Sequence, residues 1–275
     1  MDDASRAVLS ELTAADDAMT SKQPSRRVEH ISRAHERLGH HDPALAAAIG
    51  TRARGSASTL IFGGGNRVHN SPDGLICARV AAARLAEDAW AHCYYALALE
   101  GARRSEEADA AYQHALRIDP KHANILGNYA LFLTDVRGEH DRAQKLYERA
   151  LDADPTDANN LGNYARLRLE RGDDRAATDM IRSAFEHADD RHDPLRVELC
   201  MYLFALGPRD ERDRARSELA RLLAASVRSP GWDFSRIVAR AINQGHEDGD
   251  RLQDLADVIS EGADTTIVEG WIEEG

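Results

Sequence analysis

This sequence has few of the residues that build disulfide frameworks, zinc sites or membrane spans. It contains three cysteines, Cys77, Cys93 and Cys200, which are an odd number with no close pair. Neither a set of disulfides nor a set of zinc ligands is therefore indicated, and we expect small buried side chains at these positions. The longest apolar run, residues 199–207, is too short to cross a bilayer.

The N-terminus lacks the basic and then apolar residues of a secretory signal, because MDDASRAVLSELTAADD is acidic. We therefore expect a cytoplasmic protein that does not bind membranes. The formal net charge of −12 argues against nucleic acid as a partner, since such binding requires a basic surface that displaces counterions.

Motifs for catalysis are missing as well. The sequence has no GxSxG elbow, no HExxH, no P-loop lysine and no cysteine in a histidine-paired signature. His30, His35, His40 and His41 share one region, but a spacing of five does not place His30 and His35 on one helix face. We therefore expect no catalytic residues, no cofactor and no metal site.

Proline and phenylalanine are scarce, with eight and five residues, whereas alanine and leucine are frequent. This composition, with 43% hydrophobic residues, favours a folded chain that is helical throughout. We predict an all-α fold.

An internal repeat dominates the middle of the chain. ANILGNYALFL at residues 123–133 returns as ANNLGNYARLRL at residues 158–169, which is 35 residues later. A second block, EEADAAYQHALRIDP at residues 106–120, returns in altered form before Pro155 and before Asp190. AWAHCYYALAL at residues 89–99 is the degenerate first half of the earliest unit. Three units at a period of 34 to 35 residues predict stacked helical hairpins.

The recurring positions are those that close packing of helices requires. Each unit has large and small residues at spacings of three and four, which share one helix face. In the first helices they are His92, Tyr95, Ala96, Leu126, Tyr129, Ala130, Leu161, Tyr164 and Ala165. In the second helices they are Ala108, Tyr112, Ala115, Leu116, Ala143, Tyr147, Ala150, Leu151, Ala177, Ile181, Ala184 and Phe185. Alanines let the helices approach while larger side chains fill the space beside them.

This pattern resembles the tetratricopeptide repeat family, with small residues at places 8, 20 and 27, an aromatic at place 24 and proline at place 32. The unit at 123–157 matches throughout, with one extra residue before Gly138. The unit at 89–122 has Arg103 where a glycine separates the two helices. The unit at 158–192 has Asp189 instead of the last proline, and Arg168 at a usually apolar place. The LGNYA copies and a later SPGWDF segment are typical of bacterial members. The resemblance implies an α-solenoid.

The flanking regions set the predicted boundaries. Residues 1–53 should form an N-terminal helical cap, with helices at about 4–20, 24–38 and 42–49. Residues 54–73 are interpreted as a glycine-rich surface loop around Gly63–Gly65. The repeat array takes 74–192, and residues 193–275 form a C-terminal helical region with an acidic tail. In that region, 195–206 and 209–227 should be a fourth, divergent hairpin, followed by helices at 234–242, 248–260 and 265–272. Trp232 and Phe234 should dock on the preceding helices.

The resemblance also implies a concave groove lined by the first helix of each unit. We expect Cys93, Gly127 and Gly162 to face it, together with nine candidate partner-binding residues: Trp90, Tyr94, Leu97, Asn124, Asn128, Leu131, Asn159, Asn163 and Arg166. Asn128 and Asn163 either bind a partner backbone or only bond to the neighbouring hairpin. Family members that bind a C-terminal carboxylate use basic residues at places 2 and 6, and this sequence lacks them.

We therefore expect a non-enzymatic scaffold or regulatory subunit that holds a protein or peptide. A second hypothesis is self-association into a homo-oligomer. The last thirty residues hold ten acidic residues and one arginine, whereas residues 25–55 hold six arginines and three acidic residues. The alternative is that these two segments pair within one chain. A third hypothesis is an enzyme or nucleotide-responsive protein that uses the flanking regions, because glycines such as Gly63–Gly65 can bind anions.

Overall fold

The computed structural model describes residues 2–38, 42–62, 70–189, 192–229 and 233–262, and these form helices with no strand among them. The chain divides into two compact units, residues 1–146 and residues 147–275. The predicted all-α fold is confirmed. None of the described helices is both long and apolar enough to cross a membrane.

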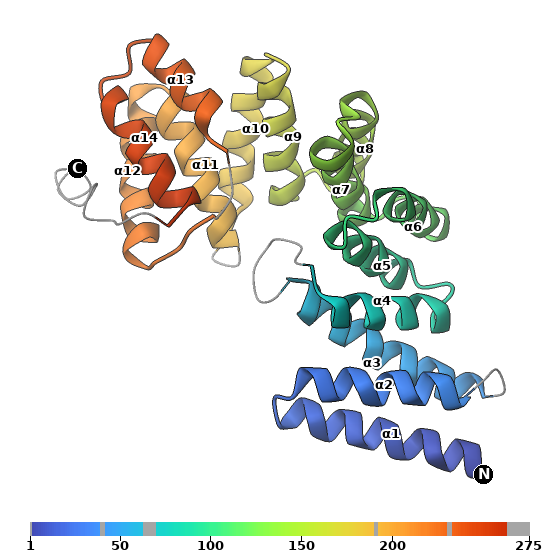
Figure 1. Cartoon of the computed structure of the whole chain (residues 1–275). Coiled ribbons are helices and arrows are strands. Elements are labelled where there is room, and N and C mark those ends of the chain that lie inside the picture. The colour runs from blue at the N-terminus through green and yellow to red at the C-terminus, as the bar shows by residue number, and fades with distance from the viewer. Residues whose placement is uncertain (1, 39–41, 63–69, 190–191, 230–232, 263–275) are drawn as a thin grey trace. The chain divides into compact units, whose positions relative to one another are not determined.

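The first unit is a series of helices that pack as neighbouring pairs (Figure 1). They are α1 (Asp3–Thr20), α2 (Pro24–Leu38), α3 (Pro43–Phe62), α4 (Pro72–Arg84), α5 (Ala89–Gly101), α6 (Ser105–Ile118) and α7 (Ala123–Phe132), then the π-helix η1 (Leu133–Arg137) and the start of α8 (His140–Ala153). Ser71 caps α4 through a hydrogen bond from Gly74 N to Ser71 Oγ, and Pro72 follows it.

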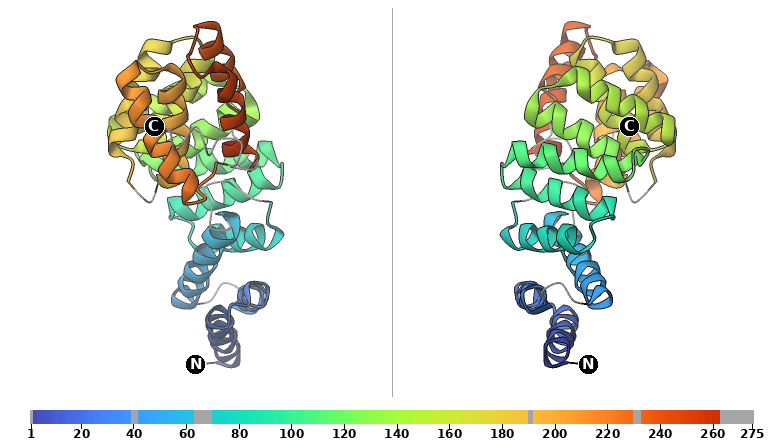
Figure 2. Two further views of the ribbon diagram at one scale, coloured as in Figure 1. Left: turned by 90° about the vertical axis from the view of Figure 1, so that its left-hand side faces the viewer. Right: turned by 90° about the vertical axis from the view of Figure 1, so that its right-hand side faces the viewer.

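The N-terminal region continues the pairing that the repeats show. Helix α1 packs on α2, and α3 packs on α4, with α3 and α4 both touching α5 (Figure 2). The N-terminal cap predicted at residues 1–53 stays a prediction, and α3, which begins inside it, contacts α5. Paired helices nevertheless begin at Asp3, whereas the sequence repeat begins near residue 89. The helices before residue 89 therefore pair without the residue pattern of the repeats.

Helix α3 is longer than the sequence predicted, since it passes Gly50 and ends at Phe62. The predicted loop at residues 54–73 is therefore wrong for residues 54–62. A Cβ at Gly50 would lie 2.6 Å from Leu85 Cγ, so glycine allows a close contact there. That packing outweighs the low helix propensity of Gly50, whereas the space beside Gly55 is open. Gly63–Gly65 lie outside the described residues.

Stacked tyrosines join successive hairpins. The rings of Tyr112 on α6 and Tyr129 on α7 are 5.2 Å apart and inclined by 16°. In the second unit, Tyr147 on α8 and Tyr164 on α9 (Ala158–Glu170) repeat this geometry at 5.4 Å and 15°. Each pair joins the second helix of one hairpin to the first helix of the next. The four rings are almost wholly buried, so they contribute packing as well as ring contacts.

The extra residue before Gly138 is accommodated as η1. A π-helix takes one more residue per turn than an α-helix, so the insertion is absorbed locally. Gly138 then has a φ of 65°, and Gly172 has a φ of 83° at the equivalent place in the next hairpin. Arg103 occupies the same place in the first hairpin with a φ of 58°, although it has a side chain.

The second unit holds the rest of the chain from Tyr147. Its helices after α9 are α10 (Asp174–His187), α11 (Asp193–Leu206), α12 (Arg209–Ala224), α13 (Ser235–Asn243) and α14 (Gly249–Ser260). The predicted fourth hairpin is present as α11 and α12. Phe234 is 2% exposed and meets Tyr202 of α11 at a ring distance of 5.9 Å, as predicted. Trp232 and residues 265–272 lie outside the described residues.

The titratable side chain of Glu100 lies beside the stacked rings of Tyr112 and Tyr129. Its carboxylate accepts a hydrogen bond of 3.0 Å from the hydroxyl of Tyr112. Burial raises the pKa of Glu100 to about 7, and the charge of Asp135 in η1 adds to the increase, although the Tyr112 bond opposes it.

Replacing Arg103 with glycine should stabilise the protein. A side chain at positive φ costs about 1 kcal/mol, and glycine removes that cost. We expect Arg103→Gly to raise the free energy of unfolding in urea by about 0.5 to 1 kcal/mol. Gly172→Ala is the matched control, because space is open at that position and only the backbone is strained. It should lower the free energy of unfolding by about 1 kcal/mol, and a gain for this control would contradict the argument.

Glu100 should make stability fall as the pH rises from about 4.5 to about 7. In that range the unfolded chain has lost the proton that the folded chain retains, so folding becomes less favourable with increasing pH. We expect Glu100→Gln to raise the free energy of unfolding at pH 8 by about 1 to 3 kcal/mol relative to wild type. The gain should disappear at pH 4, as measured by urea unfolding at both values. An equal gain at both pH values would show that titration is not the cause.

Candidate functional site

Four partly exposed rings form a continuous surface on the first unit, which we call the aromatic face. Trp90 and Tyr94 on α5 are stacked at 5.3 Å. Phe62, at the end of α3, meets Tyr94 edge-on at 6.4 Å, and His122 meets Trp90 edge-on at 5.1 Å. None of the four side chains is fully buried. The predicted neighbours Trp90 and Tyr94 are therefore together, and two further rings join them.

Local structure fixes the position of these rings. Asp88 caps α5 by accepting a hydrogen bond from Ala91 N at 3.0 Å, and Arg54 of α3 forms an ion pair with the same carboxylate. The spacing of four places Trp90 and Tyr94 on one face of α5. His122 is the residue that precedes α7. Sequence reasoning missed Phe62 because it ended α3 too early, and it missed His122 because that residue does not line a helix.

Two residues expected in the groove are buried instead. Leu97 is 4% exposed and Cys93 is 0% exposed, so neither is available to a partner. The prediction is wrong for them because α5 is apolar on more than one side, and both residues pack inside the first unit. Burial raises the pKa of the Cys93 thiol to about 12, which keeps it protonated and unreactive. Cys77 and Cys200 are also buried and free.

Helix α7 presents an amide surface. Asn124 is exposed, and Asn128 and Leu131 are partly exposed, at spacings of four and three that share one face. Asn128 Nδ2 donates to Cys93 Sγ at 3.8 Å, so its amide bonds to the preceding hairpin. Of the two roles considered for Asn128, this bond is the one to the neighbouring hairpin. Gly127 is buried and is not part of the surface.

In the second unit, α9 repeats the spacing of α7. Asn159 is exposed, and Asn163 and Arg166 are partly exposed. Arg166 Nη1 lies 3.3 Å from Glu170 Oε1, so its charge is partly compensated. Gly162 was expected in the groove, but a Cβ there would lie 2.9 Å from Leu195 Cδ1. It is a contact point between α9 and α11, which is the reason for a small residue.

Helix α11 is the first helix of its hairpin, as α7 and α9 are of theirs. The chain's own C-terminal helices cover one face of it. Helices α13 and α14 pack on α11, which is apolar on all sides and buried along most of its length. His246 Nε2 lies 2.9 Å from the carbonyl oxygen of Phe204, and Arg236 Nη1 donates to the carbonyl of Glu170 at 3.1 Å. Arg240 forms an ion pair with Asp174. Among the described residues of the second unit, the first-helix surface that α13 and α14 leave uncovered therefore belongs to α9.

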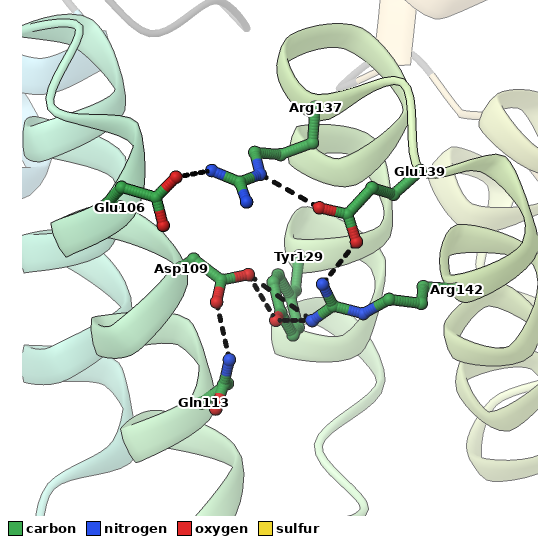
Figure 3. Close-up of polar contacts among 7 residues, drawn as sticks. All are labelled: Glu106, Asp109, Gln113, Tyr129, Arg137, Glu139 and Arg142. Atoms are coloured by element: carbon green, nitrogen blue, oxygen red, sulfur yellow. Dashed lines mark hydrogen bonds and ion pairs between the residues drawn. The ribbon is translucent and has the colours of Figure 1, made fainter.

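A polar network crosses the junction of α6, α7 and the start of α8 (Figure 3). The hydroxyl of Tyr129 donates to Asp109 Oδ1 at 2.7 Å, while Arg142 Nη2 donates to the oxygen of Tyr129. Glu139 accepts from Arg142 and from Arg137, and these bonds lower its pKa. Burial and the bond to Asp109 raise the pKa of Tyr129 to about 12. The carboxylates are paired with arginines, so the network holds hairpins together rather than transferring protons.

A related arrangement recurs in the second unit. Tyr164 donates to Glu148 Oε1 at 3.0 Å, and the guanidinium of Arg168 lies over the Tyr164 ring at 4.6 Å. Arg168 also pairs with Asp173. The arginine at a usually apolar place is thus accommodated by a cation–π contact and an ion pair.

The arginines of residues 25–55 are less available for pairing with the acidic C-terminal residues than the sequence suggested. Four of the six lie in ion pairs inside the first unit: Arg33 with Glu29, Arg37 with Glu11, Arg52 with Asp16, and Arg54 with Asp88. Electrostatic self-association through this segment would have to compete with these pairs.

The N-terminal histidines have protein partners. His30 Nδ1 lies 2.7 Å from Glu11 Oε2, and Arg84 Nε donates to His35 Nδ1 at 2.8 Å. His40 and His41 lie outside the described residues. Within the described ranges, no three His, Cys, Asp or Glu side chains are grouped so that they could hold a metal ion.

Comparison with known proteins agrees with this architecture. Residues 91–122 and residues 137–197 match two family models, each described as tetratricopeptide repeat. No curated protein matches the chain in sequence.

Solved structures with a similar fold are distant in sequence. A tetratricopeptide repeat protein from Parabacteroides merdae superposes with a TM-score of 0.53 at 14% identity, over 91% of this chain and 98% of that one. Pseudomonas aeruginosa PilF gives 0.53 at 14% identity, over 81% and 95%. PilW, a type IV pilus biogenesis factor, gives 0.52 at 17% identity, over 78% and 98%. These likenesses concern the fold, and the chain contains tetratricopeptide repeats within an all-α, solenoid-type architecture.

Proposed function

We propose that this protein is a non-enzymatic scaffold that holds a segment of another protein on the first-helix surfaces of its hairpins. The observation that carries the proposal is the aromatic face beside the amide surface of α7 in the first unit. Partly exposed aromatic side chains are the usual anchors of protein interfaces, because they bury a large area and lose little conformational freedom.

The chemistry of the surface favours a polypeptide as the ligand. Trp90 and Tyr94 offer apolar area, and the exposed amide of Asn124 on α7 can both donate to and accept from a peptide backbone. The formal charge of the first unit does not favour a phosphate-bearing ligand, because residues 1–146 hold 18 Lys and Arg against 19 Asp and Glu. An amphipathic helix or an extended segment with apolar anchors fits such a surface.

Asn159, Asn163 and Arg166 extend the proposal to the second unit. They occupy on α9 the places that Asn124, Asn128 and Leu131 occupy on α7. Arg166 stands on α9 at the place of Leu131 on α7. Its guanidinium can bond to a carbonyl or a carboxylate, whereas Leu131 offers only apolar contact.

Removing an aromatic anchor should weaken partner capture while the protein stays folded. A protein captured from the native cell by immobilised wild type is first identified and purified, and its Kd is then measured by titration. We expect Trp90→Ala and Tyr94→Ala each to raise the Kd by about tenfold or more, as for a central interface anchor. Asn124→Ala should have a smaller effect, because a partly hydrated amide bond contributes little net free energy.

Val136→Ala is the control, since Val136 is an exposed apolar residue on η1, outside the aromatic face. It should leave the Kd unchanged, and all variants should melt close to wild type. If the Kd for the partner is the same for Trp90→Ala, Tyr94→Ala and wild type, the proposed surface is not the binding site.

A further inference from the structure

The residues that follow the described structure have an unusual composition for a free segment. The described chain ends at Gly262, and residues 263–275 read ADTTIVEGWIEEG. We call these residues the tail segment. It contains Ile267, Val268, Trp271 and Ile272, together with four acidic residues. The two apolar pairs are spaced by four, so a helical conformation would place them on one side.

Charge disfavours the tail segment's own unit as its binding site. Without the tail segment, residues 147–262 hold 17 Lys and Arg and 24 Asp and Glu, a formal charge of −7. Residues 1–146 carry −1, from 18 Lys and Arg and 19 Asp and Glu. An apolar segment flanked by carboxylates therefore meets less repulsion on the first unit. There, the exposed Lys121 directly precedes His122 of the aromatic face.

In the second unit, C-terminal residues of this chain already pack against the face of a first helix, α11. Phe234, directly before α13, and Ile237 and Val238 of α13 are buried where α13 packs on α11. Arg236 and Arg240 bond at the turn of the preceding hairpin. In the first unit, the rings of the aromatic face remain partly exposed among the described residues.

We propose that the tail segment of a second copy of this chain binds the aromatic face. Trp271 and Ile267 supply the apolar contacts to the stacked rings of Trp90 and Tyr94, and the acidic residues remain at the rim. Such a contact is heterologous, because each copy contributes a different surface. It therefore leads to a ring or to an open chain of copies. This inference rests on the proposed function, since it names an occupant for the same surface.

The molar mass in solution tests the proposal. We expect wild type to associate beyond one 30.3 kDa protomer with increasing concentration, as measured by light scattering with sedimentation equilibrium. Trp271→Ser and Trp90→Ser should each reduce the mass to one protomer. Association should persist at about 0.5 M salt, where an exposed contact between opposite charges would be screened. Val136→Ala should associate as wild type does.

Mixing the two variants gives the sharper experiment. The Trp271→Ser chain retains an intact aromatic face, and the Trp90→Ser chain retains an intact tail segment. An equimolar mixture should form a one-to-one dimer and nothing larger, although each variant alone is monomeric. A fluorescent peptide of residues 263–275 should bind the Trp271→Ser chain, and its Kd should rise about tenfold or more when Trp90 is also replaced.

Several results would overturn the proposal. They are a monomeric wild type, a Trp271→Ser chain that still associates, association that disappears at high salt, or a mixture that stays monomeric. If Trp90→Ser fails to fold, as judged by circular dichroism, the Trp271→Ser variant and the peptide still decide the matter. A monomeric wild type whose capture of another protein still depends on Trp90 would refute this inference and leave the proposed function standing.

Discussion

The stack of two tyrosines between successive hairpins is the interaction on which the rest of this structure depends. Tyr112 with Tyr129, and Tyr147 with Tyr164, each place an aromatic pair where three helices meet. Small residues beside them let the backbones approach, and the hydroxyls of Tyr129 and Tyr164 bond to carboxylates of the preceding second helix. The packing therefore sets the distance between hairpins, and the polar bonds fix their rotation. The first-helix surfaces obtain their geometry from this junction.

The proposed function depends on which side of each helix is used for packing between hairpins. Ion pairs and buried rings between the second helix of one hairpin and the first helix of the next hold the hairpins together. The remaining side of the first helices is the surface proposed to bind a partner, and on α11 the chain's own C-terminal helices pack against it. The covered face of α11 and the aromatic face thus represent two outcomes for the same type of surface. The first is covered by α13 and α14, and the second is the surface for which we propose a polypeptide ligand.

The repeat allowed much of the fold to be predicted from the sequence, because a 35-residue period repeats the same packing problem. The helices predicted at 4–20, 24–38, 195–206, 234–242 and 248–260 lie close to their observed bounds. The prediction failed where the burial of a residue depends on distant parts of the chain. Gly50 lies in a helix because Leu85 packs against it, and Leu97 is buried because neighbouring helices enclose it. Phe62 and His122 join the aromatic face from outside the repeat positions, so periodicity could not reveal them. The partner-binding role of the predicted residues remains a prediction.

The π-helix at residues 133–137 has a consequence for how such arrays change in length. The additional residue stays within one widened turn, so the downstream positions of Ala143 and Tyr147 keep their phase relative to the residues that they contact. A hairpin can therefore gain or lose a residue at the end of its first helix without disturbing the register of its neighbours. Natural variation in unit length should accumulate at this point, where the molecule tolerates it, rather than inside the second helices.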